Sequence, residues 1–361
     1  MDFIQYQALW NTILTFFLLI SAVILFQISI KGYKIKNTYG ATSTLISAVI
    51  LLLLSFYNNV YGLFPWPYNG FFTWWAGILL ILYVGFWGVM KIKEKGESVN
   101  NQKNNFYADK NFYQDEISLK MEYYRKSFHL AGFLIILAFY VVCNLVNNAV
   151  IEFINDPNMI ERYERLWGSL SLYPYTINDP NAIADLTFFA LLGTFAFVCF
   201  PEYIRVLVGA KYSLYNYLTK AVLRGKEYKS AGPQIFLIIG ATTSFWFAQM
   251  GWVSYNIAIA AAVVACFSDA LAAVIGRTYG HHKVKTLDKS TKSLEGFIAG
   301  TGSAYIISMI FVGPVYAIFV AVIFFLLDYF TLPIADNLLN PILLTLGLML
   351  AIDLLGLPIG W

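Results

Sequence analysis

Charged residues are scarce in this chain. Only 12% of its 361 residues are Asp, Glu, Lys or Arg, whereas 59% are hydrophobic and 18% are aromatic. Soluble globular domains carry about 25% charged residues, so this composition excludes an ordinary soluble protein and favours one that is embedded in lipid. The formal net charge is only +3, and the distribution of the charges is more informative than their sum.

Cysteine and histidine are also rare, with three of each. Cys143, Cys199 and Cys266 all lie in apolar segments, which predicts small buried side chains and not disulfide partners. No spacing of Cys and His matches a zinc site. The chain also has no Walker motif and no Asn-x-Ser/Thr sequon. These absences exclude a P-loop nucleotide site and disfavour a glycosylated protein of the secretory pathway.

Long apolar runs are abundant. A membrane-spanning helix needs about 20 apolar residues, and ten candidates occur, at residues 9–30, 41–60, 70–90, 128–147, 185–208, 233–250, 253–275, 296–312, 314–331 and 340–357. The first run has no basic segment before it, which predicts a retained helix and not a cleaved signal peptide. We therefore expect an all-α integral membrane protein, a polytopic bundle of about ten transmembrane helices.

Lysine and arginine are distributed unevenly among the loops. They concentrate in loops 31–40, 91–126, 209–232 and 276–295, whereas loops 61–69, 251–252 and 313 contain none. The longer loop 148–184 has Arg162 and Arg165 but more acidic than basic residues. By the positive-inside rule, both ends of the chain are expected outside and every basic loop in the cytoplasm. An error of one span would break this alternation.

A polar, Asn- and Lys-rich segment divides the chain. We interpret residues 93–120 as a cytoplasmic linker. It separates residues 1–92, a three-helix membrane extension, from residues 121–361, a seven-helix catalytic domain. The extension has no charged residue inside a predicted span, so we expect it to serve structure or assembly.

Asp269 is the most informative single residue. It lies in the seventh predicted span, and an acid in lipid costs about 2.5–3.5 kcal/mol on insertion scales, so it usually has a function. Gly276 and Gly280 follow at near-helical spacing, which lets another helix or a phosphate approach the backbone closely. We expect Asp269 to bind Mg²⁺ or to act as a base for a hydroxyl. The alternative is an ion pair with a neighbouring lysine that only holds helices together.

A basic loop follows Asp269, and Lys292-Ser293-Leu294-Glu295-Gly296 then opens the next helix. Lysine binds phosphate as a point charge, and the free N–H groups of a helix N-terminus favour an anion. We therefore expect this region to bind the phosphates of a nucleotide. The predicted residues are Gly276, Arg277, Gly280, Lys283, Lys285, Lys289, Lys292, Ser293, Glu295 and Gly296. Alternatively, the lysines only obey the positive-inside rule.

Further charged residues fall on the same predicted membrane face. Arg125, Lys126 and His129 open the fourth span, and we expect Arg125 to hold phosphate and His129 to relay a proton in catalysis with Asp269. Asp336 and Asn337 precede the last span and offer a second metal ligand beside Asp269 and a hydroxyl orienter, or alternatively an N-cap. The pairs Glu202/Arg205 and Arg224/Glu227 are supporting residues or mutually neutralised ions.

These motifs resemble those of the CTP-dependent polyprenol and lipid kinases, namely dolichol kinase, phytol kinase and the CTP-using diacylglycerol kinase. The resemblance covers roughly residues 120–345 and is strongest in Arg125-Lys-x-x-His129, Asp269-Ala-x-Ala-x-x-x-Gly276-x-x-x-Gly280 and Lys292-Ser-x-Glu-Gly296. Dolichol kinase is the most similar. The resemblance implies Mg²⁺-dependent transfer of the γ-phosphoryl group of CTP to the terminal hydroxyl of a polyprenol at the cytoplasmic face.

Two other classes of protein fit the sequence less well. Phosphatidate cytidylyltransferase has a similar membrane setting, but residues 328–361 contain no histidine and so lack its C-terminal His-Gly-Gly element. A transporter would spread charges along a path through the bilayer, whereas here they gather at one predicted face. The expected partners are CTP, an isoprenoid alcohol and membrane lipid, without nucleic acid and with a homo-oligomer left open. We expect a multi-pass protein of the plasma membrane in a prokaryote, or of the endoplasmic reticulum in a eukaryote.

Overall fold

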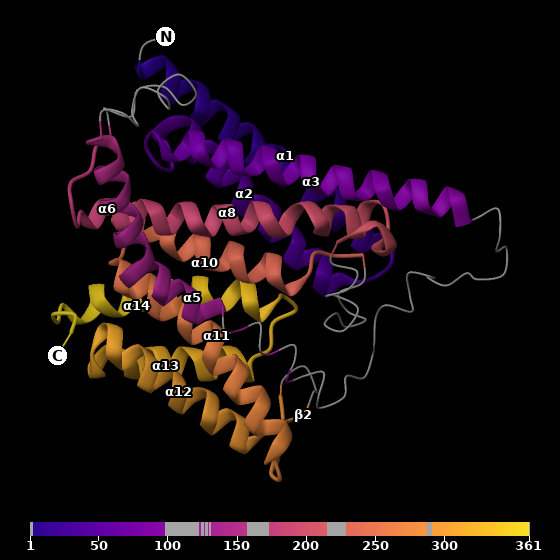
Figure 1. Ribbon diagram of the computed structural model, residues 1–361. Helices are drawn as coiled ribbons and strands as arrows, with labels where there is room; N and C mark the ends of the chain where they lie inside the picture. Colours follow the sequence, from indigo (N-terminus) through magenta and orange to yellow (C-terminus); the bar gives the residue numbers. More distant parts are fainter. Residues whose placement is uncertain are drawn as a thin grey trace. The chain divides into compact units, whose positions relative to one another are not determined.

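The fold is almost entirely helical. The computed structural model describes residues 3–97, 131–156, 173–214, 229–286 and 291–360, together with Tyr123, Lys126 and His129 (Figure 1). The helices are α1 (Phe3–Lys34), α2 (Thr38–Tyr61), α3 (Tyr68–Glu97), α5 (Ala131–Leu137), the π-helical turn η3 (Ala138–Val142), α6 (Cys143–Ile154), α8 (Pro180–Leu207), the 3-10 turn η5 (Ala210–Tyr212), α10 (Pro233–Gln249), α11 (Tyr255–Thr278), α12 (Leu294–Val312), α13 (Pro314–Tyr329) and α14 (Asp336–Leu355). Strands β1 (Lys283–Lys285) and β2 (Thr291–Ser293) pair antiparallel, with Val284 opposite Lys292.

The helices have the length and composition of membrane spans. Among the described residues, eight helical segments are long and apolar enough to cross a bilayer. These are Gln7–Lys34, Thr38–Tyr61, Tyr68–Lys93, Gly132–Ile154, Pro180–Leu207, Tyr255–Thr278, Leu294–Val312 and Asp336–Leu355. The chain is therefore an all-α integral membrane protein, as the composition predicts. The two remaining predicted spans coincide with α10 and α13, which have only 17 and 16 residues.

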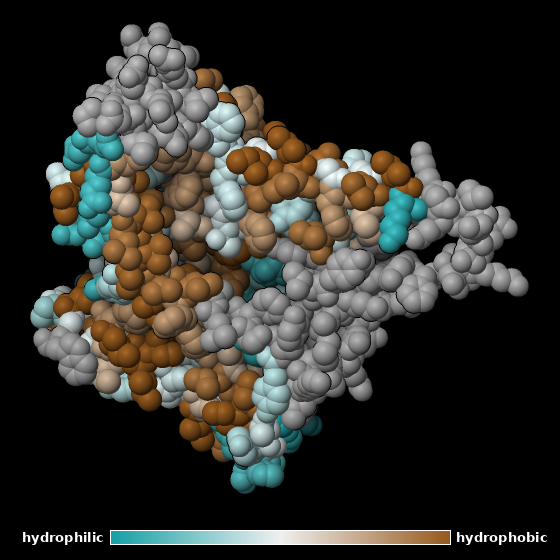
Figure 2. Space-filling view, in the orientation of Figure 1, coloured by the Kyte–Doolittle hydropathy of each residue, from teal (hydrophilic) through white to brown (hydrophobic). Residues whose placement is uncertain are grey.

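The surface is as apolar as lipid contact requires. Large hydrophobic side chains cover much of the visible surface in Figure 2. Over the described residues, the most exposed large hydrophobic side chains include Ile81 in α3 and Leu354 in α14, with 73% and 75% of their area exposed. Extended apolar surface of this kind marks a membrane contact and not a water-facing exterior.

The chain packs as two compact units. The first contains α3, α6, α8 and most of α1 and α2. The second contains α5, α10 to α14, the β1–β2 hairpin and the segment Lys31–Ser43, which comprises the end of α1 and the start of α2. This grouping by packing does not follow the expected division of the sequence at residues 93–120, which stays a prediction and whose linker lies largely outside the described residues.

The first unit is held together by aromatic side chains and by hydrogen bonds to carbonyls inside helices. Phe17 of α1 packs edge-on against Phe72 and Phe195. Pro201 lies inside α8 and has no N–H for the carbonyl of Phe197 one turn earlier. The hydroxyl of Tyr83 donates to that carbonyl at 3.1 Å, so a tertiary contact satisfies a backbone group that the proline leaves unpaired.

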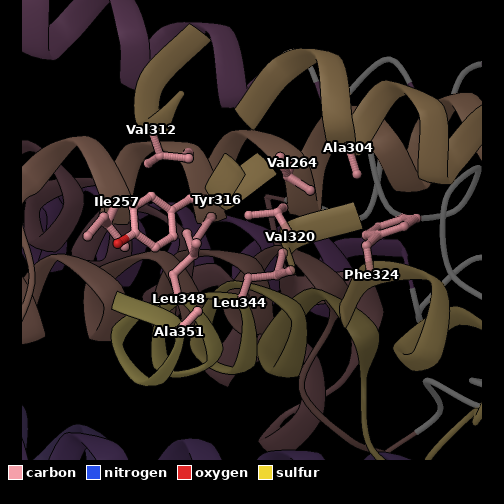
Figure 3. Packing of buried hydrophobic residues seen from close by; sticks show 12 residues of the cluster. Ile257, Val264, Ala304, Val312, Tyr316, Val320, Phe324, Leu344, Leu348 and Ala351 are labelled. Atoms are coloured by element: carbon pink, nitrogen blue, oxygen red, sulfur yellow. The ribbon is translucent and has the colours of Figure 1, made fainter. Parts of the chain in front are cut away.

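The second unit has a continuous apolar core between α11, α12, α13 and α14. Figure 3 shows Val264, Tyr316, Val320 and Leu344 at its centre, and all four are at most 1% exposed. Small residues bring α11 and α12 together. A Cβ atom on Gly296 would lie only 2.8 Å from the carbonyl oxygen of Ala272, so the helices approach at a distance that other side chains would prevent.

The segment Lys31–Ser43 is anchored inside the second unit. The hydroxyl of Ser43, which is fully buried, accepts a hydrogen bond from the backbone N–H of Ala335 at 2.8 Å. A Cβ atom on Gly40 would lie 2.3 Å from the hydroxyl oxygen of Ser230. This segment therefore contacts the residues directly before α10 and α14, and part of the expected N-terminal extension belongs to the unit that contains Asp269.

Candidate functional site

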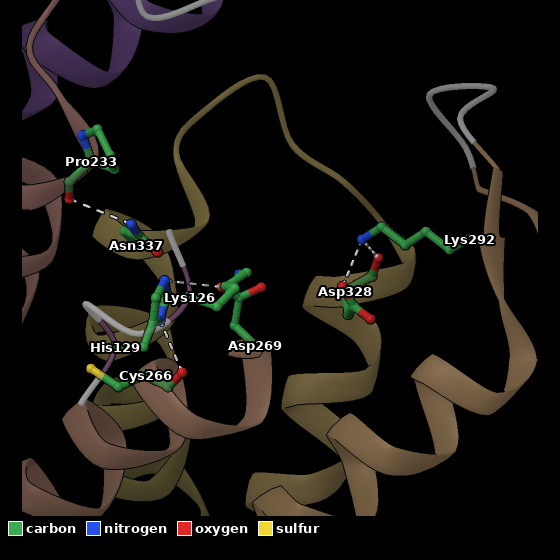
Figure 4. A network of polar contacts seen from close by, with 8 residues as sticks. All are labelled: Lys126, His129, Pro233, Cys266, Asp269, Lys292, Asp328 and Asn337. Atoms are coloured by element: carbon green, nitrogen blue, oxygen red, sulfur yellow. Dashed lines mark hydrogen bonds and ion pairs between the residues drawn. The ribbon is translucent and has the colours of Figure 1, made fainter. Parts of the chain in front are cut away.

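Asp269 forms an ion pair with Lys126. The ammonium group of Lys126 donates to Oδ2 of Asp269, which lies in the cytoplasmic half predicted for α11 (Figure 4). The side chain of Lys126 is 7% exposed and that of Asp269 is 24% exposed. Asp269 therefore has the lysine partner that the alternative interpretation, a structural ion pair, requires. Because the carboxylate keeps some access to solvent, the pairing leaves a ligand-binding role open.

His129 adds a proton-accepting nitrogen beside this pair. Its Nδ1 lies 3.0 Å from the carbonyl oxygen of Cys266. A carbonyl only accepts, so Nδ1 carries the hydrogen and Nε2 is the nitrogen that can accept a proton. Nε2 lies 3.8 Å from Oδ2 of Asp269. Gly132 permits this contact, since a Cβ atom there would lie 2.8 Å from Cβ of Cys266.

The start of α12 is an internally satisfied cap. The hydroxyl of Ser293 accepts from the N–H of Gly296 at 3.1 Å, which is the geometry of an N-cap. The carboxylate of Glu295 accepts from the backbone N–H groups of His281 and His282, both at 3.1 Å. It also lies 2.8 Å from Nδ1 of His282. Ser293, Glu295 and Gly296 therefore fold the hairpin onto α12, and their part in phosphate binding stays a prediction.

Other protein atoms already occupy the space beside the predicted glycines. A Cβ atom on Gly276 would lie 2.7 Å from the Ser293 hydroxyl, and one on Gly280 would lie 2.1 Å from the Gly276 carbonyl oxygen. Gly276 therefore packs closely against Ser293 and Gly296 at the start of α12, and the approach of a phosphate to these glycines stays a prediction. Lys283 and Lys285 are exposed in β1, and Arg277 is exposed in the last turn of α11.

Lys292 is engaged by an acid that the sequence analysis missed. Its ammonium group lies 2.6 Å from Oδ1 of Asp328 and 2.7 Å from the backbone carbonyl oxygen of the same residue. Asp328 is the penultimate residue of α13, so Lys292 also satisfies one of the free carbonyls at the end of that helix. The signal was available, because Asp328 is an acid in an otherwise apolar helix, as Asp269 is.

The two ion pairs lie close enough to interact. Asp328 interacts electrostatically with Asp269 and Lys126 as well as with Lys292. Figure 4 shows the carboxylates of Asp269 and Asp328 in the middle of the group and the two lysines on either side. The sequence positions that meet here come from α11, α13, β2 and the segment before α5, and they span more than half of the chain.

Asp336 and Asn337 open α14. The N-cap residue of α14 is Ala335, so the interpretation of Asp336 as an N-cap is wrong. Asp336 is an exposed acid in the first turn, where its negative charge interacts favourably with the helix dipole. The side-chain amide of Asn337 donates to the carbonyl of Pro233 in α10 at 3.4 Å. Within the described parts of the chain, no three His, Cys, Asp or Glu side chains gather as a metal site.

Glu202 and Arg205 form a sealed ion pair in the first unit. The guanidinium donates to both carboxylate oxygens, at 2.9 and 2.6 Å, and the two side chains are at most 1% exposed. This geometry fits the interpretation as mutually neutralised ions. Four other predicted residues, Arg125, Arg224, Glu227 and Lys289, lie outside the described residues.

Comparisons with known proteins identify no relative. No family model matches the chain, and neither a curated protein nor a solved structure matches it. An assignment of function therefore depends on the residues of the chain itself and on the contacts described above.

Proposed function

We propose that the chain is a CTP-dependent kinase that phosphorylates the terminal hydroxyl of a dolichol-type polyprenol at the cytoplasmic face of a membrane. One observation carries this proposal, namely the contact of Lys126 and His129 with Asp269. It joins the two strongest motifs of the resemblance, Arg-Lys-x-x-His and Asp-Ala-x-Ala, although Lys126 and Asp269 are 143 positions apart. Motifs that matched by chance would have no reason to meet.

The chemistry of the transfer suits this group of side chains. The alcohol oxygen forms a bond to the γ-phosphorus of CTP, the bond from that phosphorus to the bridging oxygen breaks, and CDP leaves. The proton of the alcohol must then be accepted, and both Asp269 and Nε2 of His129 are candidates. Phosphoryl transfer otherwise needs positioning and neutralised charge, which Lys126 and Lys292 supply.

Magnesium is compatible with the donor atoms at this site. Mg²⁺ is usually held by one or two carboxylates together with substrate phosphates and water, so it does not need a cage of three protein ligands. Asp269 offers a carboxylate that is partly exposed. When bound, the cation would neutralise the β- and γ-phosphates.

We further propose ten membrane crossings with both ends of the chain outside. The helices α10 and α13 complete the count, because 16 or 17 residues span about 25 Å and can cross a slightly thinned bilayer. This topology puts the start of α12, the β1–β2 hairpin and Asp336 on the cytoplasmic side, where CTP is available. The alcohol would reach the site laterally from the bilayer.

The test is a phosphorylation assay with purified protein in detergent. It uses γ-labelled CTP or ATP, Mg²⁺ and a panel of dolichol, phytol, geranylgeraniol and diacylglycerol. Label in a lipid monophosphate with CTP supports the proposal, and the best alcohol identifies the subfamily. Formation of a CDP-lipid from phosphatidate would replace the kinase by a cytidylyltransferase, and the absence of both products would favour a transporter.

A further inference from the structure

We propose that Asp328 is a second carboxylate ligand of the divalent cation, and that Lys126 and Lys292 leave the two acids to bind phosphate when a metal–nucleotide complex enters. In this scheme the two ion pairs are the resting form of the site. The inference rests on the proposed function, since it requires a nucleotide with its cation, but it concerns a different acid and a different element, α13.

The acids of the Lys126–Asp269 and Lys292–Asp328 pairs are more exposed to solvent than those of a purely structural ion pair. Asp269 and Asp328 are 24% and 20% exposed, and Lys292 is 30% exposed, whereas Lys126 is buried at 7%. In the Glu202–Arg205 pair of the first unit, the exposed fractions are 0% and 1%. A pair without solvent access offers a ligand no direct approach, whereas both acids of the candidate site reach solvent. The two pairs at the candidate site are therefore accessible to a ligand and still shielded enough for strong electrostatic interactions.

Charge balance explains why the exchange is favourable. Asp269 and Asp328 repel each other electrostatically, and in the resting form the two lysines neutralise them. A divalent cation between the acids would compensate the same two negative charges. Both ammonium groups would then be available for the phosphates, where lysine binds well as a point charge. No buried charge is left without a partner in either form, which avoids a penalty of several kcal/mol.

Two hydroxyl groups lie close to the acids in the sequence. Ser268 directly precedes Asp269 and is fully buried, and Thr331 follows Asp328 by three residues. Neither hydroxyl oxygen has a hydrogen-bond partner among the described residues. A serine inside a helix can donate to a carbonyl one turn earlier, and most buried polar atoms are satisfied. These two hydroxyls are consistent with a polar ligand at the level of the acids.

The test measures metal binding and not only activity. Purified protein in detergent is titrated with Mn²⁺ in the presence of β,γ-methylene-CTP, and bound Mn²⁺ is followed by electron paramagnetic resonance. We expect Asp328→Asn to raise the Kd for Mn²⁺ about 10-fold or more. The control is Asp353→Asn, which changes an exposed acid near the C-terminal end of α14. This variant should bind Mn²⁺ as the wild type does.

A double variant separates metal binding from structural support. Lys292→Met/Asp328→Leu removes both charges, so no unpaired ion is left behind, and such replacements are often tolerated. We expect this variant to fold and to lose Mn²⁺ binding. If it binds Mn²⁺ with nucleotide as tightly as the wild type, the pair only supports the end of α13 and the inference is wrong. If Mn²⁺ binding depends on Asp328 but no labelled lipid forms in the kinase assay, the inference stands and the proposed function fails.

Discussion

The ion pair between Lys126 and Asp269 makes a quantitative prediction about stability. Lys126→Met removes a cation that is 7% exposed and leaves a carboxylate that is 24% exposed. Loss of one partner from a buried pair destabilises a protein by about 3–5 kcal/mol, and the partial exposure of Asp269 places the expected value at the lower end, about 3 kcal/mol. Asp269→Asn leaves the more deeply buried Lys126 without its counter-charge, so a similar loss is expected.

A double-mutant cycle tests the pair directly. Lys126→Met/Asp269→Asn leaves no unpaired charge, so its loss of stability should fall short of the sum of the single losses by about 2–3 kcal/mol. The measurement is unfolding in mixed detergent micelles, followed by circular dichroism. Strictly additive losses would show that the two residues do not interact.

The same variants separate stability from catalysis. Every variant that lacks Asp269 should lose at least about 100-fold in phosphoryl transfer, because a metal ligand or base is missing. The double variant should remain inactive even though it recovers stability. Wild-type turnover in a folded Asp269→Asn protein would refute the catalytic role.

Three further predictions concern single residues. Lys292→Ala should raise the KM for CTP more than the KM for the alcohol, and an unchanged KM for CTP in steady-state kinetics would remove Lys292 from the phosphate site. Ser43→Ala removes a buried hydrogen bond to Ala335 and should destabilise by about 1–3 kcal/mol in the same unfolding assay; no change would refute the anchoring of this segment. Gly296→Ala should destabilise the protein by about 1–3 kcal/mol through overpacking. Gly302→Ala in the same helix should not, because a Cβ atom there meets nothing within 4 Å. Equal melting temperatures of the two variants would contradict the close packing of α11 and α12.

The helices could be predicted because hydropathy is a local property. All ten predicted apolar ranges coincide with helices, although only eight helical segments in the described residues satisfy the length and composition of a span. The turns at Gly251 and Gly313 adopt positive φ angles of 76° and 83°, as expected where glycine ends a helix. The short lengths of α10 and α13 follow from these tight turns and from the prolines that begin both helices.

The contacts of the site could not be predicted, because they depend on tertiary packing. The sequence identified Asp269, Lys126 and His129 separately, but only the fold pairs the lysine with the acid. Asp328 was missed because it stands alone, with no motif around it, although its position in an apolar helix was a signal. The segment Lys31–Ser43 was assigned to an N-terminal extension, since no local pattern indicates that it packs before α14.

The central claim is that this membrane protein transfers the γ-phosphoryl group of CTP to an isoprenoid alcohol. The most direct test incubates purified wild-type protein with γ-labelled CTP, Mg²⁺ and dolichol, with Asp269→Asn as the inactive control. We predict labelled dolichyl phosphate from the wild type and none from the variant. Absence of label in every alcohol of the panel, with either CTP or ATP, would contradict the claim.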